Sequence, residues 1–92
     1  MLTIQSIPIP NPLVVSQIVE GEAILVIPDK AKVKVLNEVG GFIWSQIDGE
    51  RDIVSIVSAV CAEYNIDSHT AQTDALKFLE ELFAKSLILI NS

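Results

Sequence analysis

Apolar and polar positions divide the chain into a strand-rich first part and a helical second part. Two runs rich in β-branched residues, 14–19 and 22–27, are separated by Glu20 and Gly21. A third run, 31–36, follows a Pro-Asp-Lys turn and alternates strictly between two faces. One face carries Lys32, Lys34 and Leu36, and the other carries Val33 and Val35. The three runs, joined by short turns, predict an antiparallel meander.

In the second part, apolar positions recur at the spacing of helices, and short polar residues mark where each helix begins. Asn37 and Asp52 are expected to cap the first two helices. Asp67 or Ser68 is expected to cap the third and longest helix. The first helix should end at residues 48–49, because the glycine there supplies the left-handed conformation of a helix C-terminus.

The third helix, expected to run to about Lys85, carries one apolar stripe between two unlike flanks. The stripe consists of Ala71, Ala75, Phe78, Leu79 and Leu82. One flank is apolar, with Leu76 and Phe83; the other is charged, with Asp74, Lys77, Glu81 and Lys85. A helix that packs only on its own domain needs a single stripe. The extra apolar flank therefore indicates either further core or the wall of a groove.

Residues 1–13 and the last few residues frame this central part. Pro8, Pro10 and Pro12 predict an extended arm over residues 1–13, as a tail or an edge element. Residues 14–92 are then expected to form one domain, ending in an apolar strand or plug at 87–90. Three strands followed by three helices predict an α+β domain, and its two shorter helices resemble a helix-turn-helix pair.

Composition narrows the choice of partners. Twelve Asp and Glu residues against six Lys and Arg give a formal net charge of −6, whereas nucleic-acid binders concentrate cations. One cysteine and one histidine exclude an internal disulfide and a Cys/His-rich zinc site within the chain. Without a signal-peptide pattern or an apolar run of membrane length, we expect a cytoplasmic protein that does not bind membranes.

The residue patterns of common enzymes are missing from the sequence. It contains no glycine-rich phosphate loop, no His-Glu zinc motif and no nucleophile-elbow serine. Gly40 and Gly41 are better explained by close approach of a helix turn to a neighbouring strand. His69 is better explained as an exposed residue at a helix start. No catalytic residue, metal or cofactor is therefore expected, and the chain is not predicted to be an enzyme.

Three of the six cations, Lys30, Lys32 and Lys34, follow the period of a strand. Lysines on an edge strand discourage edge-to-edge aggregation. The same open edge can also accept an extended peptide as an added strand, with lysines meeting acidic side chains. Composition favours neither explanation. A winged-helix DNA-binding or regulatory domain is the alternative function, but its second helix, 53–64, carries no basic residue.

Three motifs give a more specific indication. Residues 36–44 read Leu-Asn-Glu-Val-Gly-Gly-Phe-Ile-Trp, residues 47–51 Ile-Asp-Gly-Glu-Arg, and residues 74–82 Asp-Ala-Leu-Lys-Phe-Leu-Glu-Glu-Leu. In this order they resemble the signature of the PqqD-like family, also called precursor-peptide recognition elements. The resemblance spans roughly residues 22–89. It implies a winged-helix-like domain, with a three-stranded antiparallel sheet followed by three helices.

The resemblance also implies a function. A PqqD-like chain would be a non-catalytic adaptor that binds the leader of a ribosomally made precursor peptide between its third strand and third helix. It would present the leader to a maturation enzyme, such as a radical-SAM enzyme, a leader peptidase or a cyclase. The resemblance leaves open which precursor is bound, and whether the arm exchanges between protomers to form a homodimer.

Carried onto this chain, the resemblance assigns peptide binding to one strand and one helix. The strand residues are Lys32, Val33, Lys34, Val35 and Leu36. The helix residues are Asp74, Leu76, Lys77, Phe78 and Glu81. One departure from the family is Ser86, where relatives often carry glycine.

Overall fold

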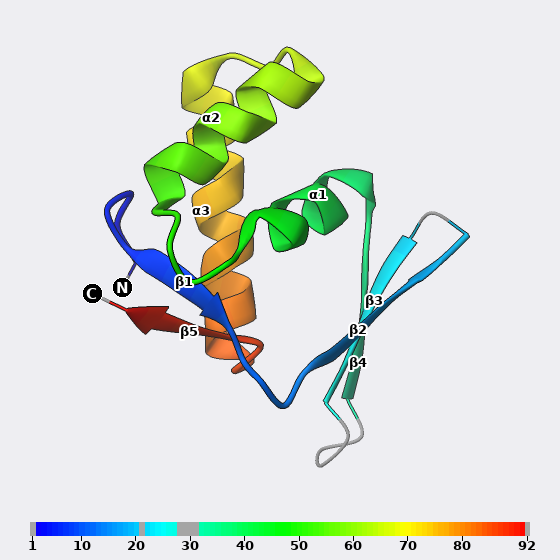
Figure 1. Cartoon of the computed structure of the whole chain (residues 1–92). Helices are drawn as coiled ribbons and strands as arrows, with labels where there is room; N and C mark the ends of the chain where they lie inside the picture. Colours follow the sequence, from blue (N-terminus) through cyan, green and yellow to red (C-terminus); the bar gives the residue numbers. More distant parts are fainter. Residues whose placement is uncertain (1, 21, 28–31, 92) are drawn as a thin grey trace.

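The computed structural model describes residues 2–20, 22–27 and 32–91, and this part of the chain forms five strands and three helices (Figure 1). The strands are β1 (Ile7–Pro10), β2 (Val15–Val19), β3 (Glu22–Ile27), β4 (Lys32–Leu36) and β5 (Ile88–Asn91). The helices are α1 (Glu38–Gln46), α2 (Ile53–Tyr64) and α3 (Ser68–Ala84). The predicted α+β class is confirmed, as is the order of three sheet strands followed by three helices.

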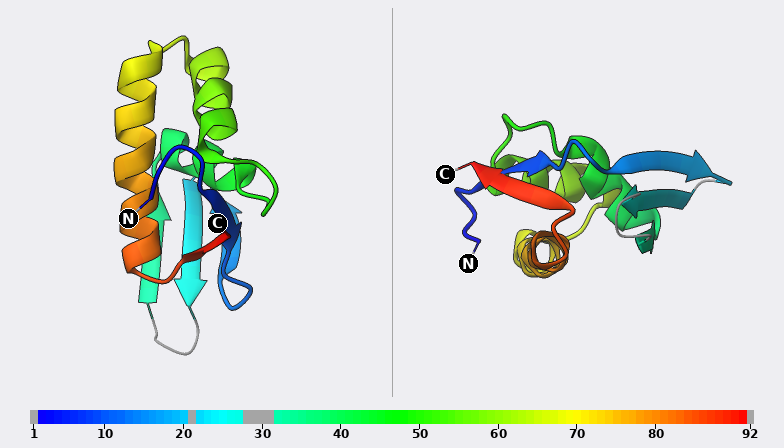
Figure 2. Two further views of the ribbon diagram at one scale, coloured as in Figure 1. Left: turned by 90° about the vertical axis from the view of Figure 1, so that its left-hand side faces the viewer. Right: turned by 90° about the horizontal axis from the view of Figure 1, so that it is seen from below.

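Strands β2, β3 and β4 form the predicted antiparallel meander, in that spatial order. β3 has the predicted bounds, β2 begins one residue later than predicted, and the expected start of the third run at residue 31 lies outside the described residues. Helix α3 runs along β4 in the opposite direction (Figure 2). An ion pair between Lys34 of β4 and Glu81 of α3 shows that this strand and this helix face each other.

The two faces of this sheet differ in burial. Leu25, Ile27 and Leu36 on the inner face are buried in the core. On the outer face, the side chains of Val33 and Val35 are 64% and 55% exposed. The predicted alternation along β4 is therefore present, and its valines are the residues that face outward.

Polar side chains begin the three helices as predicted. Asn37, Asp52 and Asp67 each accept a hydrogen bond from the backbone N–H three residues later. The predicted end of α1 was wrong, because the helix ends at Gln46 and Ile47 is already extended. The reason is local: the side chain of Asp48 accepts hydrogen bonds from two later backbone N–H groups, an alternative to helical pairing.

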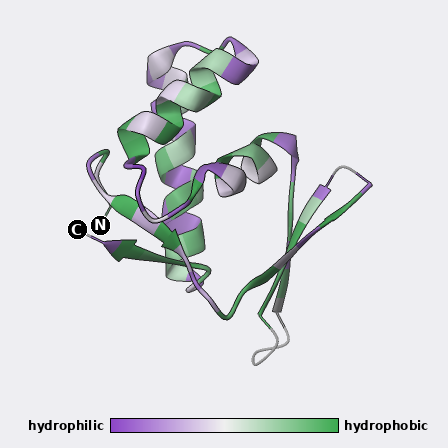
Figure 3. Ribbon diagram, in the orientation of Figure 1, coloured by the Kyte–Doolittle hydropathy of each residue, from purple (hydrophilic) through white to green (hydrophobic). Residues whose placement is uncertain are grey.

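The proline-rich segment is an edge element rather than a free tail. Strand β1 pairs antiparallel with β5, and both are apolar along most of their length (Figure 3). Further back, the carbonyls of Ile4 and Ser6 accept hydrogen bonds from the N–H groups of Val54 and Ile53. These N–H groups belong to the first turn of α2, which has no partners for them within the helix. The segment thus satisfies a helix terminus.

Helix α3 ends in a Schellman motif. Leu87 donates its N–H to the carbonyl of Leu82, and Ser86 donates its N–H to that of Phe83. Ser86 adopts a left-handed conformation, with φ of 60°. Glycine is favoured at this position because it has no Cβ to clash with the backbone. The departure from the family pattern therefore falls where the backbone conformation is unfavourable for serine.

We expect Ser86→Gly to stabilise the protein by about 0.5–1 kcal/mol, because relief of the left-handed strain exceeds the entropy that glycine adds to the unfolded chain. Urea unfolding of both proteins measures the difference. Ser86→Ala is the matched control, since alanine keeps the Cβ. Equal unfolding free energies for the glycine and alanine variants would contradict this explanation.

The cap carboxylates predict acid sensitivity. The backbone N–H of Ser55, which donates to Asp52, lowers the pKa of that carboxyl group. Its contribution to stability is therefore complete above the unfolded-state pKa of about 3.9 and is lost as pH falls through the lower folded-state pKa. Asp52→Asn keeps a cap acceptor but cannot titrate. We expect this variant to show a shallower decline in unfolding free energy between about pH 5 and pH 2; an unchanged slope in acid unfolding would exclude the effect.

Candidate peptide-binding groove

The register of the sheet determines which backbone groups of β4 are available. Val19 pairs with Glu22 across a two-residue turn in which Glu20 has a φ of 52°. In such a turn the first carbonyl accepts from the fourth N–H, so this pair is hydrogen-bonded. Hydrogen-bonded and non-hydrogen-bonded pairs alternate along an antiparallel ladder. Ala23, Leu25 and Ile27 therefore direct their backbone groups toward β4.

Two residues of β4 direct their backbone groups away from the sheet. Lys34 pairs with Leu25 and Leu36 pairs with Ala23, so their backbone groups are used within the sheet. Val33 and Val35 present their N–H and C=O groups on the opposite side. Among the described residues no strand pairs there, and β1 is paired with β5 instead. We call the backbone groups of Val33 and Val35 the open edge.

The wall beside the open edge comes from α3. Asp74, Phe78, Glu81 and Lys85 recur at intervals of four, three and four residues, which places them on one side of the helix. Phe78 was predicted as core, but its ring is only partly buried, whereas Ala71, Ala75, Leu79 and Leu82 are buried. The side of the helix that faces β4 is thus the flank predicted to be charged. The ring of Phe78 adds an apolar part to this flank.

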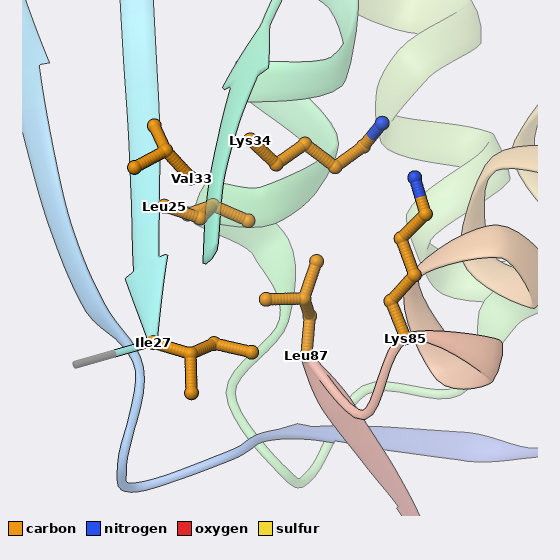
Figure 4. A pocket seen from close by; sticks show the side chains of 6 residues that line it. All are labelled: Leu25, Ile27, Val33, Lys34, Lys85 and Leu87. Carbon is orange, nitrogen blue, oxygen red and sulfur yellow. The ribbon is translucent and has the colours of Figure 1, made fainter. Parts of the chain in front are cut away.

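We call the space between the open edge and this side of α3 the groove. A hollow of about 380 Å³ lies at its lower end, near the C-terminus of α3. Its lining comes from β3, from β4 and from the turn that joins α3 to β5: Leu25, Ile27, Val33, Lys34, Lys85 and Leu87 (Figure 4). The lining is aliphatic apart from two lysines, whose ammonium groups approach each other from the strand and from the helix. The hollow can hold an apolar side chain with a negative charge nearby.

A carboxylate joins the two lysines. Glu81 forms ion pairs with Lys34 of β4 and, at 3.5 Å, with Lys85 of its own helix. The hydrogen bond from Lys34 is the main reason that the pKa of Glu81 is lowered, followed by the positive charge of Lys34. Two cations therefore share one carboxylate, and the lower hollow has a local excess of positive charge on an acidic protein.

A second hollow, of about 330 Å³, lies at the upper end of the groove. It is lined by Asn37, Val39, Gly40, Ile43, Ile66, Asp74 and Phe78. A Cβ at Gly40 would lie 3.2 Å from the Phe78 ring, and one at Gly41 would lie 3.4 Å from the Cβ of Ala23 on β3. The predicted close approach to a strand is confirmed for Gly41, whereas the neighbour of Gly40 is a helix, α3. The small size of both residues lets α1 pack closely at this end.

The residues assigned to peptide binding from the resemblance fall into two groups. The groove brings together the open edge and the side chains of Lys34, Asp74, Phe78 and Glu81. The remaining helix residues lie farther from it: Lys77 is exposed at the margin, and Leu76 lies roughly 160° around the helix from Phe78. On the strand, Leu36 is a core residue, and the side chain of Lys32 lies outside the described residues.

Sequence reasoning found Val33, Lys34, Asp74 and Phe78 but missed the other residues that line the two hollows. Lys85 could have been found, because it continues the four-three-four spacing of Asp74, Phe78 and Glu81. Leu87 and Ile66 carry no such signal, since they come from connecting segments whose path depends on tertiary packing. The floor of the groove is therefore a product of the fold rather than of one motif.

The groove combines an open strand edge with a partly apolar helical wall. In the described ranges, no group of three His, Cys, Asp or Glu side chains is placed to hold a metal ion. None of the helices described combines the length and apolar character needed to cross a bilayer. An open edge beside a partly apolar wall is an arrangement that binds extended peptides by strand addition.

Comparisons with known proteins agree with this geometry. A family model described as coenzyme PQQ synthesis protein D (PqqD) matches residues 22–88. No curated protein sequence matches the chain. The solved structure of TbiB1 in complex with the TbiA(beta) leader peptide is similar, with 32% identity over 87% of this chain and 93% of that chain and a TM-score of 0.80.

A second similar structure is lasso peptide synthetase B1 complexed with the leader peptide, with a TM-score of 0.81 over 90% of this chain and 98% of that chain. Its identity is 13%, so this likeness concerns the fold alone. The family model, by contrast, covers most of the chain, and the identity to TbiB1 extends over nearly all of it. This chain belongs to the PqqD family.

Proposed function

We propose that this protein is a non-catalytic adaptor that binds the leader segment of a ribosomally synthesised precursor peptide and presents it to a maturation enzyme. The observation that carries the proposal is the open edge at Val33 and Val35, which lies beside the α3 wall and between two hollows. The TbiB1 structure, which contains a leader peptide, supports the same class of ligand.

Binding would complete the sheet. The leader backbone would pair with the N–H and C=O groups of Val33 and Val35 and become a fourth strand of the β2-β3-β4 sheet. Because side chains alternate along a strand, every second leader residue would face the groove. Backbone pairing supplies affinity for any extended chain, and the hollows supply selection among sequences.

The lower hollow specifies the type of side chain. Leu25, Ile27 and Leu87 would surround an aliphatic or aromatic leader residue. Lys34 and Lys85, which share Glu81, would favour an acidic residue next to it in the leader. The proposed ligand is thus an extended peptide with an apolar anchor beside a carboxylate.

The partner enzyme would act on the part of the precursor that the groove does not hold. The family includes adaptors of radical-SAM enzymes, leader peptidases and cyclases, and the partner of this chain is proposed from that range. DNA binding is less well supported, because α2 carries no basic residue. Helix α3 carries one lysine, Lys77, and Lys85 at its C-terminal end is paired with Glu81.

Titration of the protein with the TbiA(beta) leader peptide, followed by amide NMR, tests the proposal. We expect the largest shifts at Val33 and Val35 and along the groove side of α3. Val33→Pro removes one open-edge N–H without removing a bond of the protein's own sheet, because that N–H faces away from β3. The variant should stay folded and bind the leader at least about tenfold more weakly.

Val33→Thr is the matched control, because threonine keeps the backbone N–H and the branched side chain. Isothermal titration of the three proteins compares their affinities, and urea unfolding verifies that each is folded. A folded proline variant with unchanged affinity would rule out strand addition at this edge.

Lys34→Glu should weaken leader binding mainly through charge. It places a second carboxylate beside Glu81 and removes one of the two ammonium groups of the lower hollow. We expect a larger loss of affinity at about 50 mM than at about 500 mM salt, since salt screens exposed charges. Arg51→Glu makes the same change in net charge away from the groove, and equal losses in both variants would mean that only net charge matters.

A further inference from the structure

We infer that Asn11, in the segment between β1 and β2, is a positioning residue for the lower hollow of the peptide-binding groove. Its side-chain amide donates a hydrogen bond to the carbonyl of Ser86 at 2.7 Å, and its backbone N–H donates to the carbonyl of Leu87 at 3.1 Å. Both acceptors lie in the turn that joins α3 to β5. The inference rests on the proposed function of the groove.

This turn carries two of the residues that line the hollow. Lys85 immediately precedes Ser86, and Leu87 follows it. The Schellman motif uses the N–H groups of Ser86 and Leu87. Asn11 binds the carbonyl groups of the same two residues, so donors and acceptors of the turn are both held. With the backbone fixed on both sides, the buried Leu87 side chain keeps its place in the lining, and the Lys85 side chain starts from a fixed Cα beside it.

Asn11 is itself held in place. Its side-chain oxygen accepts a hydrogen bond from the N–H of Leu13 at 3.0 Å, and its carbonyl accepts one from the N–H of Val14 at 2.9 Å. These two bonds form the turn that leads into β2. The same residue therefore links the turn before β2 to the turn after α3.

The contact between Asn11 and Ser86 stabilises a strained backbone conformation. A serine in the left-handed conformation is less stable there than a glycine. A hydrogen bond from Asn11 to the Ser86 carbonyl favours that backbone conformation over the alternatives. Asn11 also lies outside residues 22–88, the part of the chain that matches the family model. The groove of this protein thus depends on a segment that the family pattern does not contain.

The test uses Asn11→Asp in the full chain. Aspartate retains the oxygen that accepts from Leu13 but replaces the amide donor with an oxygen that repels the Ser86 carbonyl. In the free protein, we expect the methyl signals of Leu87, Leu25 and Ile27 to shift and hydrogen exchange of the Leu87 amide to accelerate. Binding of the TbiA(beta) leader peptide should weaken about three- to tenfold, the range for one lost hydrogen bond.

Controls separate positioning from general stability. Gln5→Ala changes an exposed residue that precedes β1 and should leave the methyl signals and the affinity unchanged. Asn11→Ser, a milder change, serves if the aspartate variant does not fold. Methyl signals of Ile56 and Val60, deep in the α2 side of the core, should stay in place in every variant.

Two results would overturn the inference. One is a folded Asn11 variant whose Leu87 methyl signals and Leu87 amide exchange match those of the unmodified protein. The other is a clear change at Leu87 with leader affinity within twofold of that of the unmodified protein. If the unmodified protein itself does not bind the leader, the proposed function fails for that peptide, while the measurements on the free protein still decide whether Asn11 positions the turn.

Discussion

The pairing of β3 with β4 is the constraint on which the rest of the molecule depends. Burial of Leu36 against the helices, on the same face of the sheet as Leu25, allows only one register of β4, since a shift of β4 by one residue would bring Val33 and Val35 inward and expose Leu36. The same register decides which backbone groups of β4 are used by the sheet. Core packing and the availability of a peptide-binding edge are therefore consequences of one alignment.

The groove combines a rigid apolar floor with a charged and more mobile rim. Its floor consists of core residues from β3 and from the turn between α3 and β5, which the packing of the domain already holds in place. Its rim consists of lysines and Glu81, all partly exposed, which exchange partners at little cost. A site built in this way is pre-organised for an extended backbone and adaptable toward the side chains it carries.

Much of this architecture could be predicted from the sequence, because strand alternation, helix caps and the apolar stripe of α3 are local patterns. The predictions failed or stayed incomplete where a residue depends on distant partners. The side chain of Asp48 accepts hydrogen bonds from its own loop, and α1 ends earlier than predicted. Leu76 faces away from the groove, although its position on the apolar flank of α3 predicted a place in the groove wall. The hollows are lined by segments that lie far apart in the sequence. No periodic pattern of residues predicts that these segments come together.

Val35 contributes to two surfaces of the protein. Its backbone groups belong to the open edge, and its side chain lies on the outer face of the sheet. A fluorophore attached to a cysteine at this position would lie beside an incoming strand without entering the groove. The chain has one other cysteine, Cys61, which is partly buried in α2 and can be replaced by serine or alanine. The outer face thus offers a labelling position from which peptide capture can be followed in real time.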